Sequence, residues 1–130
     1  MEIDSLRFTF RKKERLKLRR DIKLLFEEGR TLQSQFFVVI YRKNGLDYSR
    51  IAVSVRKKFG KANRRNKVRR WVRECFRTNK RYFPKGFDMM FIARKALSEK
   101  FSEVNYHKIC EELLKLCARI VDEKNTALSH

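Results

Sequence analysis

The 130-residue sequence contains little glycine, proline or histidine, and it has few acidic residues for its size. Four glycines and one proline leave no room for long linkers, so residues 1–130 are expected to form a single domain. No apolar run approaches the roughly 18 residues that a membrane-spanning helix needs. The first ten residues, MEIDSLRFTF, lack the apolar stretch of a secretory signal. These absences predict a cytoplasmic protein with no membrane partner.

The residues that usually hold metals or perform catalysis are scarce. Cys75, Cys110 and Cys117 lack the short spacing of a metal site, and two of them fall on apolar helix stripes, so buried free thiols are expected. The sequence has only two histidines, and its acids are scattered. Because two-metal hydrolysis needs clustered carboxylates, an autonomous protein nuclease is disfavoured. No catalytic residue and no metal-binding residue are predicted.

Positive charge is abundant, with 34 lysines and arginines against 15 acids and a net charge of +19. Such an excess repels itself in a folded chain unless a polyanion neutralises it. Residues 1–97 carry most of it, whereas residues 98–130 are close to neutral. Nucleic acid is the first candidate partner, and an anionic membrane surface is the second.

Hydrophobic periodicity in the first half predicts one helix and two strands. Residues 1–17 form a basic N-terminal segment without a clear period, and apolar residues at helical spacing then predict a helix that ends at Gly29. Residues 35–42, QFFVVIYR, and residues 51–55 read as strands. Because Asn44-Gly45 is a turn signal, these two strands are predicted to form a hairpin.

The second half predicts helix, strand and helix. The second helix covers residues 62–80, the third main strand residues 87–93, and the last helix residues 102–122. Residues 123–130 are expected to be a flexible tail. The order helix, strand, strand, helix, strand, helix predicts an α+β fold, a small α/β sandwich with about four strands.

The second helix combines a buried stripe with dense positive charge. Ten of the eighteen residues from Arg56 to Arg73 are cationic and none is acidic. Apolar residues nevertheless recur at helical spacing: Val68, Trp71, Val72, Cys75 and Phe76. At 100° per residue, Arg65, Arg69 and Arg73 follow the rim of this stripe. Burial of the stripe would therefore hold three guanidinium groups in a row, and a planar guanidinium can bind phosphate oxygens in a bidentate manner.

Less specific interpretations of this helix remain. It could be the solvated face of a highly charged protein, although acids are absent where ion pairs at i,i+4 would be expected. It could lie on a membrane surface, although Trp71 and Phe76 fit a sandwich core better. The charge and fold class also suit a ribosomal or ribosome-assembly protein that binds ribosomal RNA.

Several separated blocks resemble the protein subunit of bacterial ribonuclease P. RRNKVRRWVRECFR resembles the arginine-asparagine-arginine signature helix of that family. LKLRRDIKLLFEEGR, FFVVIYRKNGLDYSR and FDMMFIARKALSE follow the order of the family's other blocks, and the resemblance covers about residues 8–120. It implies a ribosomal-protein-like fold with a left-handed crossover. It also implies an endoribonuclease that removes the 5′ leader from precursor tRNA, in which the RNA subunit carries the catalysis.

The resemblance also implies which residues contact RNA. The residues expected to bind the catalytic ribonuclease P RNA are Arg64, Arg65, Asn66, Lys67, Arg69, Arg70 and Arg73. Those expected to line a cleft for the single-stranded 5′ leader are Ile22, Phe26, Arg56, Lys57, Lys61, Arg94 and Lys95. No cofactor is expected on the protein itself, Mg²⁺ is required by the RNA subunit, and no protein partner is required.

Two positions differ from the pattern of the family, and a third keeps it. Lys67 stands where the family often has arginine, which keeps the charge but loses the planar fork. Ile22 stands where an aromatic residue is common, which puts a stacking contact to a leader base in doubt there. Phe26 keeps that option, because bases stack on aromatic rings, but simple core packing explains Phe26 equally well.

Overall fold

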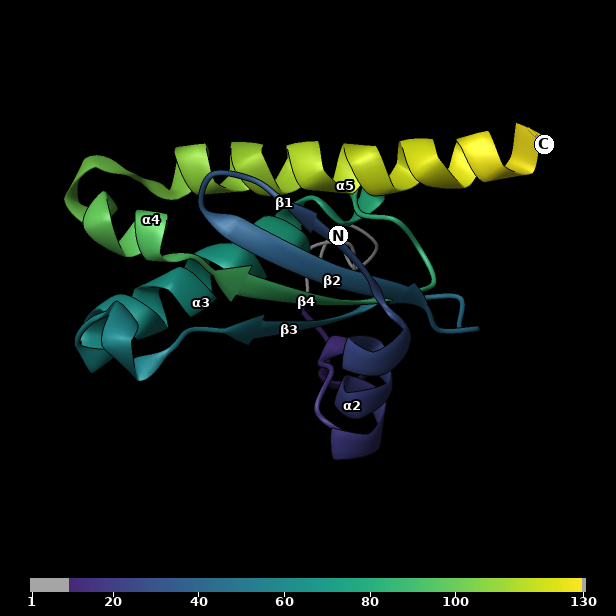
Figure 1. Cartoon of the computed structure of the whole chain (residues 1–130), viewed down its shortest axis with the longest axis horizontal. Coiled ribbons are helices and arrows are strands. Elements are labelled where there is room, and N and C mark those ends of the chain that lie inside the picture. Colours follow the sequence, from purple (N-terminus) through teal and green to yellow (C-terminus); the bar gives the residue numbers. More distant parts are fainter. Residues whose placement is uncertain (1–9, 130) are drawn as a thin grey trace, which may run out of the picture.

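Four strands form one mixed sheet with helices on both faces (Figure 1). The computed structural model describes the backbone of residues 10–129 and the side chains of residues 10–123. The helices are α2 (Arg19–Glu28), α3 (Ala62–Thr78), α4 (Lys95–Glu99) and α5 (Tyr106–Ser129). The strands are β1 (Arg30–Gln33), β2 (Phe37–Lys43), β3 (Arg50–Ser54) and β4 (Phe87–Ala93). The predicted α+β sandwich with four strands is confirmed, and the handedness of its crossover stays a prediction.

The predicted hairpin between the second and third strands is wrong. The strand order is β1-β2-β4-β3, so β4 lies between β2 and β3. It runs antiparallel to β2 and parallel to β3. The Asn44-Gly45 turn is present, with Gly45 at a φ of 76°, but the loop passes over the start of β4. The amide N–H of Asn44 donates to Gly86 O at 2.9 Å, and its side chain donates to Asp88 Oδ1 at 3.0 Å.

Strand β1 has no counterpart in the sequence prediction. Its residues RTLQ are mostly exposed and show no apolar alternation, so the usual strand signal is missing. It forms because Ser34 closes a tight connection to β2, with Ser34 N–H donating to Phe37 O at 2.8 Å. The position of β1 therefore follows from the reversal of the chain at Ser34 and not from a pattern of apolar side chains.

The main core lies between one face of the sheet and the helices α3 and α5. Alternate residues of β2 point into it, including Phe37 and Val39, which are both fully buried. Val39 lies opposite Phe91 of β4 in the sheet register. The α5 side chains that complete this core are Ile109, Leu113, Leu116, Cys117 and Ile120.

Helix α2 covers part of the opposite face. Leu25 of α2 is 1% exposed and packs with Leu16, Ile40 and Met90 in a smaller cluster. Figure 1 shows α2 below the sheet and α5 above it. The fold is therefore a three-layer arrangement, and each face of the sheet has its own apolar cluster.

The C-terminal region differs from the prediction at both ends. The prediction placed a short connection at Arg94-Lys95 before a last helix beginning at about Ser102, but α4 and a short 3-10 turn at Phe101–Glu103 occupy this segment. Helix α5 then begins at Tyr106 and continues to Ser129. It therefore includes most of residues 123–130, which the sequence analysis had interpreted as a tail.

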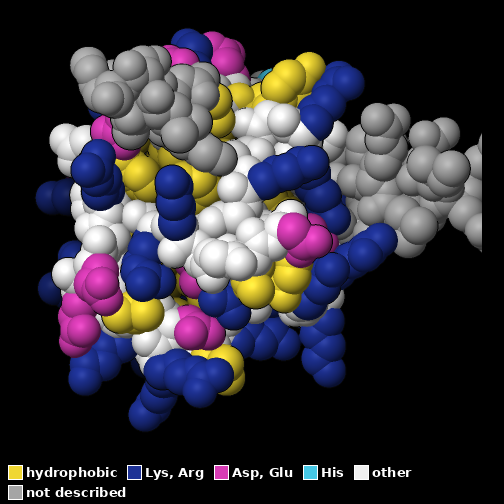
Figure 2. All heavy atoms as spheres, turned by 90° about the vertical axis from the view of Figure 1, so that its right-hand side faces the viewer, with side chains coloured by type: hydrophobic (Ala, Val, Ile, Leu, Met, Phe, Trp, Pro, Cys, Tyr) yellow, Lys and Arg dark blue, Asp and Glu magenta, His cyan; other side chains and the backbone are white. Residues whose placement is uncertain are grey.

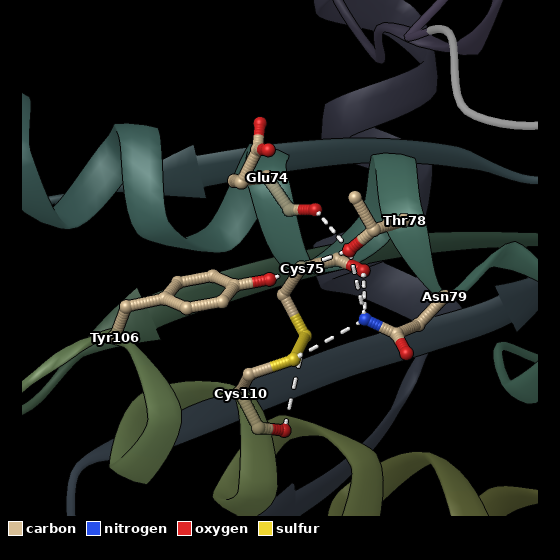
Figure 3. Close-up of a disulfide and its surroundings, with 6 residues drawn as sticks. All are labelled: Glu74, Cys75, Thr78, Asn79, Tyr106 and Cys110. Atoms are coloured by element: carbon tan, nitrogen blue, oxygen red, sulfur yellow. Dashed lines mark hydrogen bonds between the residues drawn. A yellow bond between two sulfur atoms is a disulfide. The ribbon is translucent and has the colours of Figure 1, made fainter. Parts of the chain in front are cut away.

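The expectation of three free thiols is also wrong. Cys75 of α3 and Cys110 of α5 form a disulfide, whose Cα atoms are 5.4 Å apart (Figure 3). Both residues lie on apolar stripes, and the packing of α3 against α5 brings these stripes together. Cys117 alone keeps a free thiol, and burial raises the pKa of that thiol far above its usual value. The disulfide therefore joins the basic helix covalently to the core.

Candidate nucleic-acid interface

Helix α3 is held to the core by the stripe that the sequence predicted. Val68, Val72 and Cys75 are fully buried, Phe76 is 2% exposed, and Trp71 is 8% exposed. Burying an aliphatic or aromatic side chain of this kind contributes about 1.5–3 kcal/mol. The stripe and the disulfide together fix the helix axis and its rotation, so the positions of its polar side chains are fixed as well.

The arginine row, defined as Arg65, Arg69 and Arg73, lies along the edge of this buried face. Arg65 and Arg69 are half-buried, and Arg73 is exposed. Two local hydrogen bonds orient the row: Arg65 Nε donates to Gly60 O at 3.1 Å, and Arg69 Nη1 donates to Asn66 Oδ1 at 3.0 Å. The stems therefore rest on protein while the guanidinium groups stay accessible.

The positive charge of the row is not neutralised by nearby carboxylates. Among the salt bridges of residues 10–123, none involves a member of the arginine row. Glu74, the one acid in α3, forms its salt bridge with Arg77. Burial, together with the charges of Arg15 and Arg69, lowers the pKa of Arg73. Arg69 and Arg15 therefore repel Arg73, and a bound anion would relieve that repulsion.

Aromatic rings support the cations on the other rim of α3. The Arg64 guanidinium lies 5.0 Å from the centre of the Phe101 ring. The Lys67 ammonium lies 5.4 Å from the ring centre of Trp71, which itself stacks on Phe101. Arg64, Lys67, Arg70 and Asn66 are all exposed, so these cation–π contacts orient charges that remain open to solvent.

A groove follows the arginine row, and one of its walls comes from outside α3. Its volume is about 480 Å³, and its lining includes Phe10 of the N-terminal segment. The Phe10 ring packs edge-on against Phe76 with ring centres 5.7 Å apart. Phe10 is not among the site residues predicted from the sequence, and Phe8, the next phenylalanine before it, lies outside the described residues. The lining residues on α3 are Asn66, Arg69, Arg70, Arg73, Glu74 and Arg77.

Four of the predicted leader-binding residues follow two neighbouring strand ends. Arg56 and Lys57 come after β3, and Arg94 and Lys95 come after β4. Because β3 and β4 are parallel, both pairs follow the C-terminal ends of their strands and lie at the same end of the sheet. Lys61 follows at the start of α3 and is exposed. The topology thus gathers the basic members of this set at the C-terminal ends of β3 and β4.

Arg94 has a structural contact as well as a place in this set. Its Nη1 donates to Ser34 O at 2.6 Å and to Gln35 O at 3.4 Å. The guanidinium therefore ties the turn between β1 and β2 to the end of β4. Arg56, Lys57 and Lys95 are exposed, so their charges at the ends of β3 and β4 are more accessible to a ligand than that of Arg94.

The two α2 residues of the set differ in exposure. Ile22 is half-buried and packs against the smaller cluster beneath α2. Phe26 is 55% exposed, so core packing does not account for it. Leu25 takes the buried position instead, and one residue further along a helix turns the side chain by about 100°. Phe26 therefore presents an aromatic face to solvent.

A partly open strip of the sheet lies between α2 and the basic strand ends. Ile40 and Met90 lie under α2. The same face carries Val38, two residues before Ile40 in β2, and Ile92, two residues after Met90 in β4. Val38 and Ile92 are paired across β2 and β4, and both are only half-buried. Ser54 at the end of β3 continues this strip. An apolar floor with cations at one end could hold an extended single strand.

The composition of the described residues limits the chemistry of this surface. Within them, no three histidine, cysteine or acidic side chains lie together as metal ligands would. No helix in the same part of the chain is long and apolar enough to cross a membrane. The prediction that the protein itself binds no metal and supplies no catalytic residue stays a prediction.

The fold and this surface together define a basic α+β protein built to bind nucleic acid. The ribonuclease P family model matches residues 10–121. The chain is 57% identical over 112 residues to the ribonuclease P protein component of Thermotoga maritima, covering 86% of this chain and 96% of that protein. It is 34% identical over 109 residues to the corresponding protein of Dictyoglomus turgidum, covering 84% of this chain and 90% of that protein.

Solved structures of ribonuclease P proteins also match this chain. The Thermotoga maritima ribonuclease P protein matches with a TM-score of 0.77 at 57% identity, over 82% of this chain and 96% of that one. The Staphylococcus aureus ribonuclease P protein matches with a TM-score of 0.71 at 28% identity, over 83% and 94%. The chain belongs to the bacterial ribonuclease P protein family. It is the protein component of the ribonucleoprotein enzyme that processes tRNA.

Proposed function

We propose that this protein binds the ribonuclease P RNA through α3 and the single-stranded 5′ leader of precursor tRNA through the opposite side of the sheet. The RNA-binding set on α3 is Arg64, Arg65, Asn66, Lys67, Arg69, Arg70 and Arg73. The leader-binding set is Ile22, Phe26, Arg56, Lys57, Lys61, Arg94 and Lys95. The two sets lie on different elements, so one protein could hold both RNAs at once.

The observation that carries the proposal is the fixed and unneutralised arginine row. A buried stripe sets the position of the helix, and no salt bridge among residues 10–123 involves the row. Phosphate groups on a folded RNA would supply the missing negative charge, and arginine can meet them with two hydrogen bonds each. A rigid row favours RNA in which phosphates have a matching spacing, which a folded catalytic RNA provides.

The leader cleft is supported by a different set of features. An exposed aromatic ring at Phe26, a half-buried apolar strip and several exposed cations suit a single strand, because unpaired bases stack while phosphates seek positive charge. Phosphate contacts carry no sequence information. Such a cleft would therefore accept many different leaders, as an enzyme that processes many tRNAs requires.

The catalytic step is assigned to the RNA subunit and its Mg²⁺. Among the described residues, no three histidine, cysteine or acidic side chains lie together as metal ligands would. The protein's role is to bind, to orient the precursor and to neutralise phosphate charge. Because RNA folding without such a protein depends on Mg²⁺ for neutralisation, the protein should matter most when Mg²⁺ is scarce.

Leader removal in low Mg²⁺ tests this proposal. Ribonuclease P RNA and a precursor tRNA are incubated with and without the protein, and the released leader is measured. We expect the protein to stimulate cleavage strongly at limiting Mg²⁺ and less as Mg²⁺ rises. The protein without the RNA subunit should release nothing. A lack of stimulation, or cleavage by the protein alone, contradicts the proposal.

A further inference from the structure

A second basic surface lies outside both proposed RNA-binding sets. The N-terminal basic surface consists of the eight cations between residues 11 and 23, all of them exposed: Arg11, Lys12, Lys13, Arg15, Lys17, Arg19, Arg20 and Lys23. They extend from the 3-10 turn Lys12–Glu14 to the outer side of α2. Figure 2 shows lysine and arginine side chains gathered along the lower part of the molecule, where Figure 1 places α2.

The acids within this segment are turned inward. Glu14 is 6% exposed, accepts a hydrogen bond from the Arg11 backbone N–H at 2.7 Å, and pairs with Lys80 at 2.8 Å. Asp21 pairs with Arg50 at 3.2 Å, beside the buried Asp88. Both carboxylates therefore serve the interior of the fold. The outer surface keeps its positive charge almost unopposed, apart from an exposed Lys23–Glu27 contact at 3.9 Å.

The backbone beneath this surface is anchored and not a loose tail. Leu16 is 4% exposed, and its N–H donates to Ile51 O at 2.8 Å. Arg15 forms a parallel bridge with Ile51, so the segment runs beside β3 at the edge of the sheet. Leu25 then holds α2 against the sheet. The cations are therefore displayed from fixed positions, as they are on α3.

The same path makes this surface continuous with the arginine row. Phe10 lies in the groove beside Arg69 and Arg73 on the α3 side of the sheet. Arg15 is close enough to Arg73 for its charge to contribute to the lowered pKa of that guanidinium. The chain then passes the β3 edge and continues as α2 on the opposite face. Positive charge thus extends around the β3 edge from one layer to the other.

Arg19 and Arg20 occupy positions at which positive charge destabilises a helix. They are the first two residues of α2, next to the positive end of the helix dipole. Within the described part of the chain, neither they nor Lys17 have a hydrogen bond or ion pair through the side chain. Their position is unfavourable for folding and unexplained by internal contacts, so it points to an external anion.

We infer that the N-terminal basic surface is an additional contact for the catalytic RNA, and that it binds phosphates of the same RNA as the arginine row. This inference rests on the proposed function, because it takes ribonuclease P RNA as the ligand. Continuity with Arg73 favours that RNA over the leader, whose proposed cleft lies on the inner side of α2. The contact is electrostatic and reads no bases.

The test neutralises three cations of this surface. The variant K17Q/R19Q/R20Q is compared with K100Q/K108Q/K115Q, which removes the same charge from exposed lysines of the C-terminal half. Affinity for ribonuclease P RNA alone is measured across a salt series, and circular dichroism checks the fold. We expect the first variant to bind about 10- to 100-fold more weakly with a salt slope smaller by about 2–3, since each phosphate contact contributes about 0.9. The control should stay close to wild type.

Two results would overturn the inference alone. The first is equal behaviour of the two variants while the wild-type protein binds the RNA normally. The second is unchanged binding to the RNA subunit with a loss confined to precursor tRNA, measured on the reconstituted enzyme. If the wild-type protein itself shows no preference for ribonuclease P RNA over another folded RNA, the proposed function fails and the inference fails with it.

Discussion

Replacing Arg65, Arg69 and Arg73 together with alanine is expected to weaken binding to the ribonuclease P RNA by about 100- to 10,000-fold. Hydrogen bonds to charged groups contribute about 1.5–3 kcal/mol each, and neighbouring contacts do not add fully. The salt slope should fall by about 2–3 at the same time. Filter binding or fluorescence anisotropy at several salt concentrations measures both quantities.

The fold should survive this change. No salt bridge among residues 10–123 involves the three side chains, and the hydrogen bonds of Arg65 and Arg69 are local, to Gly60 O and Asn66 Oδ1. Removing the three side chains therefore breaks no ion pair among these residues and lowers the repulsion between neighbouring cations. A thermal melt close to that of wild type is expected. A large loss of helix signal would mean that the row serves the fold, and the binding result would then have no bearing on recognition.

A lysine version of the same variant separates charge from geometry. The substitutions R65K, R69K and R73K keep the three charges but replace the planar fork with a single ammonium group. We expect an intermediate affinity with a nearly unchanged salt slope. If this variant binds as tightly as wild type, bidentate geometry is irrelevant and the row acts only as a line of charge.

Replacing Phe26 with alanine should lower the affinity for precursor tRNA by about 5- to 100-fold without changing the affinity for mature tRNA. The expected size follows from the ~1–3 kcal/mol that one base gains by stacking on an aromatic ring. The ratio of the two dissociation constants is measured on the reconstituted enzyme, so that any general loss of binding cancels.

Leu18 offers a matched control for Phe26. It is 52% exposed, compared with 55% for Phe26, and it directly precedes the same helix. Replacing Leu18 with alanine should leave the ratio unchanged. Equal ratios for F26A and L18A would show that Phe26 takes no part in leader binding.

The sequence predicted elements whose signals are local and strong. Residues 87–93 form a nearly continuous apolar run, and β4 has both of the predicted ends. The helix predicted from residue 62 begins there, and its apolar stripe from Val68 to Phe76 repeats at helical spacing. The hairpin prediction failed because Asn44-Gly45 shows only that the chain turns. It does not show that β4, some forty residues later, takes the place beside β2.

The surface of α3 could be predicted for a similar reason. Once Val68, Val72 and Phe76 are assigned to the core, helical geometry alone places the arginine row at the rim. The remaining features depend on the tertiary path. Phe10 enters the groove and Arg15 approaches Arg73 only because the N-terminal segment runs past the β3 edge. The Cys75–Cys110 disulfide likewise required the packing of α3 on α5, which spacing in the sequence does not reveal.

The most direct test of the central claim compares the whole protein with a peptide of residues 61–80. The peptide carries the same arginines, but a helix of this length is only marginally stable without its buried face. Each is titrated with ribonuclease P RNA and with an unrelated folded RNA of equal length. If packing fixes the row for recognition, the protein should prefer ribonuclease P RNA by at least about 100-fold, a modest ratio for specific binding, and the peptide by less than about tenfold. A peptide that keeps the full preference would contradict the account, because charge alone would then be sufficient.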